Sequence, residues 1–174
     1  ENIKISNIYS FVNENANSKD EIGQELLNIL TKEAKPNDLV VLYFAGHGDV
    51  DNEFHKGYLL LNSVKPASFG YKFNQAISLN DIKDLIQLAS NKGIKTLLLT
   101  DACRSGIVVS TEKYKNQTLT SLTNNWGIDG KIVSCQPYEN SHEGLQWGNG
   151  HGVFTYYLVN GLKGMADADK NSIV

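Results

Sequence analysis

The chain contains Val40-Val41-Leu42-Tyr43-Phe44, an apolar run that leads directly into Ala45-Gly46-His47-Gly48. A second run of the same kind, Thr96-Leu97-Leu98-Leu99-Thr100, leads into Asp101-Ala102-Cys103-Arg104-Ser105-Gly106. Short runs rich in Val, Leu and Thr that are followed by small residues are typical of buried parallel strands. In open α/β sheets, ligands bind at the carboxyl ends of such strands. The sequence therefore predicts a site on loops at that edge, with His47 and Cys103 brought together by adjacent strands.

Patterns typical of helices and strands alternate along the rest of the chain. Ser18 and Glu21 have the Ser-x-x-Glu form of a capping box, and an apolar stripe follows them. Amphipathic helices are predicted at 18–33 and 79–90, and further short strands at 8–12 and 58–61. This alternation predicts an α/β fold with helices on the faces of a largely parallel sheet.

Length and composition exclude several classes of protein. The 174 residues, 41% of them hydrophobic, fit one domain with a substantial core. A formal net charge of −3 argues against non-specific binding to nucleic acid. No apolar run approaches the roughly 18 to 20 residues that span a bilayer, so neither a membrane-spanning segment nor a signal peptide is expected from these residues. Two cysteines form no disulfide framework, so a reducing compartment such as the cytoplasm is the default, with secretion left open.

The segments around His47 and Cys103 resemble the caspase-like cysteine peptidases, and more closely their metacaspase, paracaspase and bacterial relatives. In the metacaspase pattern a Gly precedes the His and an Asp stands two residues before the Cys, as Gly46 and Asp101 do here. Residues 132–136 and 150–158 are similar to the small-subunit strand and helix of the bacterial and paracaspase-type members. The resemblance covers about residues 8–170 and implies a three-layer α/β/α caspase-like fold with a mostly parallel central sheet.

The resemblance also divides the single domain, 1–174, into parts. Residues 110–129 are polar and without periodicity, which predicts a linker. Residues 1–109 then correspond to a large subunit and 130–174 to a small one. Family members begin with a strand and a helix for which this sequence has too few residues. We therefore expect a longer biological product, with a missing N-terminal segment or a fused regulatory domain.

The resemblance implies a catalytic pair in which Cys103 is the nucleophile and His47 is the base. The thiolate is the nucleophilic form of cysteine, and a histidine within reach can take up the thiol proton. The backbone N–H groups of Gly48 and Cys103 are assigned by the same resemblance to the oxyanion hole. No residue that orients His47 is evident from the sequence.

Asp101 stands two residues before Cys103, so in an extended strand the two side chains leave on the same side. A carboxylate there favours a basic substrate residue, and metacaspases and paracaspases, which carry this Asp, cleave after Arg or Lys. A second pocket acid is predicted at Glu139 or, in second place, Glu143. An alternative is that Asp101 caps a following helix or holds the loop. Specificity for basic residues also predicts autoprocessing within the linker, at Lys113 or Lys115.

Two other function classes stay open at this point. The chain also resembles, less closely, the clostripain-like peptidases that cleave after Arg, and some family members are catalytically silent scaffolds. No organic cofactor and no metal site is predicted. Asp167, Asp169 and Asn171 resemble the start of a calcium loop, although a solvated turn is the better interpretation. Some metacaspases need calcium, so activation by Ca²⁺ is kept as a question. The predicted partners are protein or peptide substrates.

Overall fold

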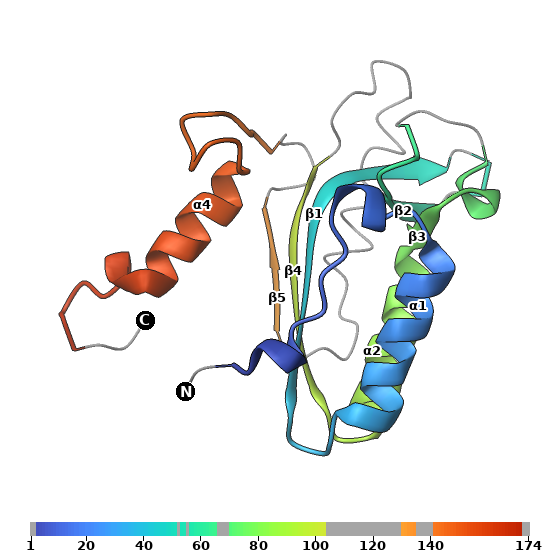
Figure 1. Cartoon of the computed structure of the whole chain (residues 1–174), viewed down its shortest axis with the longest axis horizontal. Coiled ribbons are helices and arrows are strands. Elements are labelled where there is room, and N and C mark those ends of the chain that lie inside the picture. The colour runs from blue at the N-terminus through green and yellow to red at the C-terminus, as the bar shows by residue number, and fades with distance from the viewer. Residues whose placement is uncertain are drawn as a thin grey trace.

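A twisted sheet lies at the centre of the computed structural model, which describes residues 3–51, 53–54, 56–65, 70–103, 130–134 and 141–171. Within these residues the sheet has five strands in the order β3-β2-β1-β4-β5 (Figure 1). The strands are β1 (Leu39–Asp51), β2 (Lys56–Leu60), β3 (Ala76–Ser78), β4 (Lys95–Cys103) and β5 (Gly130–Val133).

The sheet is mixed, and β1 is the strand at which its character changes. β1 pairs in parallel with β4 along Leu39–His47, and β4 pairs in parallel with β5. From His47 to Asp51 the other edge of β1 pairs with β2 in antiparallel fashion, and β2 pairs in the same way with β3. The predicted α/β architecture is therefore confirmed, with a parallel half that carries the apolar runs and an antiparallel half beside it.

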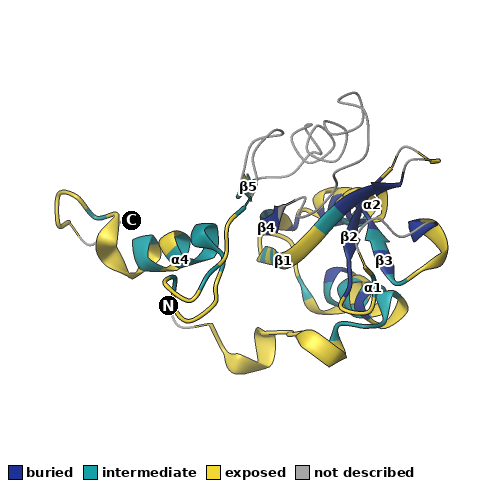
Figure 2. Cartoon of the chain, turned by 90° about the horizontal axis from the view of Figure 1, so that it is seen from above, coloured by how far each residue is buried: buried dark blue, intermediate teal, exposed yellow. Residues whose placement is uncertain are grey.

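Helices lie on both faces of the sheet. The helix α1 (Lys19–Asn28) continues into a π-helical turn (Ile29–Glu33), and it lies beside α2 (Leu79–Asn91) on one face (Figure 1). The helix α4 (Val153–Asn160), extended by a second π-helical turn (Gly161–Met165), lies apart from them beyond β5 and β4 (Figure 2). The helices α1 and α2 correspond to the helices predicted at 18–33 and 79–90. β5 and α4 correspond to the segments 132–136 and 150–158, which resemble the small-subunit strand and helix.

The main core lies between α2 and the sheet. Its buried members are Leu59, Leu79, Ile82, Ile86, Leu98 and Ala102, with Leu42 and Phe44 packed against them. Leu98 and Ala102 are alternate residues of β4 and therefore share one face of the sheet. Leu99 and Asp101, which alternate with them, lie on the opposite face, and Asp101 contacts α4 there. This alternation determines which side of β4 is available for chemistry.

Local sequence signals set the ends of both long helices. The Ser18 hydroxyl accepts a hydrogen bond of 3.2 Å from the Glu21 N–H at the start of α1, and Ser78 accepts one of the same length from Asn80 at the start of α2. Gly93, with φ of +71°, follows the end of α2 in the left-handed conformation that favours glycine. These caps confirm the predicted starts and stops.

Two sequence expectations are wrong. Residues 8–12 form no strand; they are exposed and lie between short 3-10 helices at Ile5–Asn7 and Asn13–Asn15. A strand needs a neighbour to take up its backbone hydrogen bonds, and in the described structure no strand pairs with this segment. His47 and Cys103 also lie within strands rather than on loops. β1 runs four residues past His47 because β2 supplies it with a new partner there.

The predicted strand at 58–61 is present as β2, shifted by one or two residues. The short strand β3, which precedes α2, was not predicted from the sequence. The predicted linker, 110–129, lies outside the described residues. None of the helices in the described part of the chain is long and apolar enough to cross a membrane.

Candidate active site

The parallel ladder places His47 directly opposite Cys103. The register runs through nine residue pairs, from Leu39 opposite Lys95 to His47 opposite Cys103. Cys103 is the last residue of β4. Adjacent strands lie about 4.7–4.9 Å apart, so the two backbone positions are immediate neighbours at the carboxyl edge of the parallel half. His47 is exposed there. The predicted proximity of the two residues is thus present in the backbone.

Gly48 follows His47 and pairs with Leu59 of β2. A Cβ atom at this position would meet nothing closer than the Tyr58 carbonyl oxygen, at 3.7 Å, which is an ordinary van der Waals contact. The packing of the described residues therefore does not require glycine here. The absence of a side chain at Gly48 agrees with a need for close access by another molecule.

The side chain of Asp101 is hydrogen-bonded to the segment that precedes α4 and to the first turn of α4. Only 7% of the residue is exposed. Its Oδ1 accepts a hydrogen bond from the Ser141 hydroxyl at 2.9 Å, and its Oδ2 accepts two from Thr155, one from the N–H at 3.2 Å and one from the hydroxyl at 2.5 Å. A buried carboxylate needs such donors because it has lost its hydration. The alternative in which Asp101 caps a helix is therefore part of the structure.

Tyr43 extends this network to β1. Its hydroxyl oxygen lies 2.7 Å from that of Thr155. A hydroxyl has a single hydrogen to donate, and the hydrogen of Thr155 is directed to the Asp101 carboxylate. Tyr43 is therefore the donor to Thr155, and the hydrogen bonds run from Tyr43 through Thr155 to Asp101. The chain of bonds connects the His47 strand, α4 and the Cys103 strand.

The N-terminus of α4 receives its cap from another element. Its N-cap residue, Gly152, has no side chain to accept a hydrogen bond, and Asp101 accepts the N–H of Thr155 in its place. A negative charge at this end is also favoured by the helix dipole. A Cβ on Gly152 would overlap the Asp101 carboxylate, whereas the backbone conformation of Gly152, φ −65° and ψ 145°, is open to any residue. The contact with Asp101 is therefore the reason for glycine at this position.

Two further buried acids, Asp49 and Asp51, lie on β1 beyond His47 and accept hydrogen bonds from Tyr71. Asp49 and Asp51 are only 1% and 3% exposed. Tyr71 links them, because its hydroxyl donates to Asp49 Oδ2 at 2.5 Å and its N–H donates to Asp51 Oδ2 at 3.1 Å. Burial, followed by the charge of Asp51, raises the pKa of the neighbouring Tyr58 phenol. The rings of Tyr58 and Tyr71 are in contact, with their centroids 5.8 Å apart.

The remaining predicted site residues are divided between described and undescribed parts of the chain. Glu143 is exposed and pairs through its backbone with Gly152, next to the start of α4. It lies two residues from Ser141, which contacts Asp101 directly. Glu139, Lys113 and Lys115 lie outside the described residues, and so does the side chain of Cys103.

The segment that resembles the start of a calcium loop forms a turn closed by its own side chains. The Asn171 N–H donates to Asp167 at 3.0 Å and to Asp169 at 3.3 Å, and the Asn171 side chain donates to Asp169 at 2.8 Å. Asp169 and Asn171 are exposed, and Asp167 is half-buried. Over the described ranges, no group of three or more His, Cys, Asp or Glu side chains could hold a metal ion.

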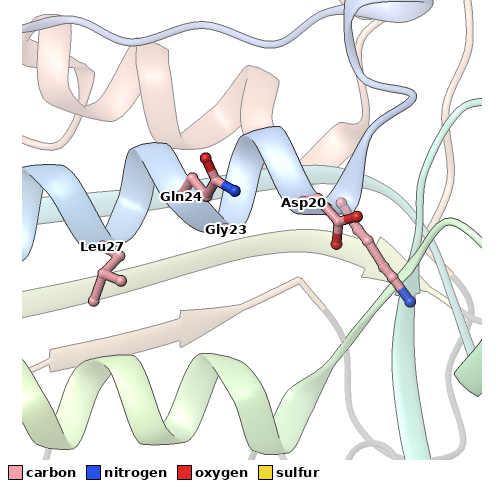
Figure 3. A pocket seen from close by; sticks show the side chains of 5 residues that line it. Asp20, Gly23, Gln24 and Leu27 are labelled. Atoms are coloured by element: carbon pink, nitrogen blue, oxygen red, sulfur yellow. The ribbon is translucent and has the colours of Figure 1, made fainter.

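A separate hollow lies on α1, away from the His47–Cys103 edge. Lys19, Asp20, Gly23, Gln24 and Leu27 line this open depression of about 320 Å³ (Figure 3). All of these residues belong to one helix, on the sheet face opposite to the one that Asp101 shares with α4. The hollow therefore has no part in the arrangement around Asp101.

Asp101 was predictable as a candidate site residue from the sequence, but its hydrogen-bond partners were not. Ser141 and Thr155 are 40 and 54 residues away along the chain, and hydroxyl residues on their own give no signal of such a role. The one sign in the sequence is Gly152, which precedes the apolar helix without a side chain that could cap it. A helix start of this kind predicts an acceptor from elsewhere.

Comparison with known families identifies the class of protein. Residues 7–173 match the family model of the caspase domain. The match spans nearly the whole chain, so the chain belongs to the caspase domain family, as its motifs predicted. This membership indicates a cysteine peptidase with protein substrates. Comparisons with curated proteins and with solved structures gave no match.

The contact between Gly152 and Asp101 predicts a specific effect on stability. Gly152→Ala should lower the free energy of unfolding by roughly 1–3 kcal/mol, because the added methyl group displaces α4 from the carboxylate. Gly23→Ala is the matched control, since a Cβ there meets nothing within 4 Å and alanine in a helix interior should stabilise by about 0.5–1 kcal/mol. Urea unfolding of both variants measures the change in the free energy of unfolding, which should be a decrease for Gly152→Ala and an increase for Gly23→Ala. Equal effects of the two substitutions would contradict the close contact at Gly152.

Proposed function

We propose that the protein is a cysteine endopeptidase in which Cys103 and His47 form the catalytic dyad and which cleaves peptide bonds after basic residues. The observation that carries this proposal is the parallel register that puts His47 opposite Cys103 at the carboxyl edge of the sheet. Membership in the caspase domain family supports the cysteine peptidase activity in this proposal.

The reaction follows from the chemistry of the two groups. His47 takes the thiol proton, and the Cys103 thiolate attacks the carbonyl carbon of the scissile bond. The C–N bond then breaks as the imidazolium donates its proton to the leaving amine, which leaves a thioester on Cys103. Water, deprotonated by His47, attacks the thioester. The carboxylic product departs and the thiol is regenerated.

The developing oxyanion needs hydrogen-bond donors close to the attacked carbonyl. The N–H groups of Gly48 and Cys103 are proposed for this role, and removal of one such donor typically costs a factor on the order of 100 to 1,000 in turnover. Gly48 is supported by its packing, because the fold itself has no steric need for glycine there.

Asp101 is proposed as the acid that recognises the basic substrate residue. It lies two residues before Cys103 on the same strand, and the hydrogen bonds it receives keep its carboxylate fixed. Glu143, exposed beside the start of α4, and Glu139 are the candidates for a second acid. Asp101 would then both hold α4 and attract the substrate.

The dyad is tested with matched fluorogenic peptides that end in Arg, Lys or Asp. The wild-type protein should cleave the Arg and Lys peptides, and Cys103→Ala or His47→Ala should lower kcat/KM by a factor on the order of 1,000 or more. Cys135 is the second of the two cysteines and has no proposed role in the reaction, so Cys135→Ala is the matched control for loss of a thiol and should retain activity. Cleavage after Asp would overturn the basic specificity, and failure of a peptidyl electrophile to label Cys103 would favour a silent scaffold.

The same specificity predicts self-processing in the linker at Lys113 or Lys115. On incubation, the wild-type chain should separate into two fragments that intact-mass analysis assigns to cleavage after one of these lysines. The double variant Lys113→Gln, Lys115→Gln should stay intact while it still cleaves a Lys peptide. A wild-type chain that stays intact under conditions in which it cleaves that peptide would refute self-processing.

Calcium dependence is tested by comparing peptide hydrolysis in calcium with hydrolysis in a chelator. The turn at 167–171 satisfies its own polar groups, so we expect equal rates in the two solutions. A rate that depends on calcium would require a site elsewhere in the chain.

A further inference from the structure

Thr155 uses both acceptor positions on one carboxylate oxygen of Asp101, the acid proposed to recognise the basic substrate residue. An ionised carboxylate has about four acceptor positions, two on each oxygen. Oδ2 of Asp101 receives both the N–H and the hydroxyl of Thr155, while Oδ1 receives only the Ser141 hydroxyl. With respect to the described residues, Oδ1 therefore retains one acceptor position and Oδ2 retains none.

The two basic side chains that a substrate can offer place different demands on this carboxylate. A guanidinium binds best as a fork, with one N–H on each carboxylate oxygen. An ammonium is a compact point charge that can bind a single oxygen. Asp101 as it is held by Thr155 can accept the ammonium on Oδ1, but it has no position on Oδ2 for the second arm of the fork.

We propose that Thr155 is a specificity-determining residue that biases the enzyme toward lysine over arginine before the scissile bond. This inference rests on the proposed function, in which Asp101 recognises the basic residue. Tyr43 strengthens the bias, because by donating to Thr155 Oγ1 it leaves the Thr155 hydrogen directed at Asp101. The bias is therefore built into the junction between α4 and the two central strands.

The test compares kcat/KM for two fluorogenic peptides that differ only in Lys or Arg before the scissile bond. The wild-type protein should prefer the Lys peptide. Thr155→Ala removes the hydroxyl, frees a position on Oδ2 and opens space beside it. The ratio of Arg to Lys cleavage should then rise by about tenfold, which is the order of magnitude of one charge-assisted hydrogen bond. Thr155→Ser retains the hydroxyl and is the matched control, with an unchanged ratio.

Each outcome bears on the inference. A wild-type protein that cleaves the Arg peptide as well as or better than the Lys peptide would overturn it, and this measurement decides the matter even where Thr155→Ala does not fold. An unchanged ratio in a folded Thr155→Ala, shown by circular dichroism and by labelling of Cys103, would also overturn it. An equal rise in Thr155→Ser would do the same. Cleavage of neither basic peptide by a wild-type protein whose Cys103 is labelled would instead refute the basic specificity of the proposed function.

Discussion

The parallel ladder between β1 and β4 is the constraint on which the rest of the arrangement depends. Its register decides that His47 lies opposite Cys103, and the register is itself fixed by alternation. Leu98 and Ala102 of β4 are buried against Ile82 and Ile86 of α2. A slip of β4 by one residue would turn Asp101 into that apolar core without a hydrogen-bond donor, at a cost of several kcal/mol. Packing on one face of the sheet therefore determines the chemistry at its edge.

The opposite face of the same strand explains how the two halves of the domain are joined. Asp101 is buried there, and Ser141 and Thr155, both from the C-terminal part of the chain, donate hydrogen bonds to its carboxylate. In return the carboxylate caps a helix whose own N-cap residue is glycine. Each part thus satisfies a polar group of the other, and β4, the strand that ends at Cys103, is held at a defined position relative to the N-terminus of α4.

Features encoded by neighbouring residues were predictable from the sequence. Ser18 and Ser78 cap their helices and Gly93 follows the second one, because each acts within a few residues of its own position. The pairing of His47 with Cys103 was predictable because both follow apolar runs that end at one edge. The strand expected at 8–12 failed because an extended apolar segment becomes a strand only where a neighbour pairs with it. The donors to Asp101 were missed because they lie 40 and 54 residues away, and the family match, not a local pattern, established the class of protein.

The change of partner along β1 has a consequence for how the domain can vary. Up to His47 the strand is ordered by nine parallel pairs with β4, and from His47 onward its other edge belongs to the antiparallel pair of β2 and β3. The pair of β2 and β3 is thus attached beyond the point at which the register already places His47 opposite Cys103. Insertions between β2 and β3, or substitutions at Tyr58 and Tyr71, can therefore reshape the antiparallel part of the sheet without changing the register that places His47 opposite Cys103. The fold thus separates the parallel pairing of β1 with β4 from an antiparallel part of the sheet whose connecting segments can vary in length.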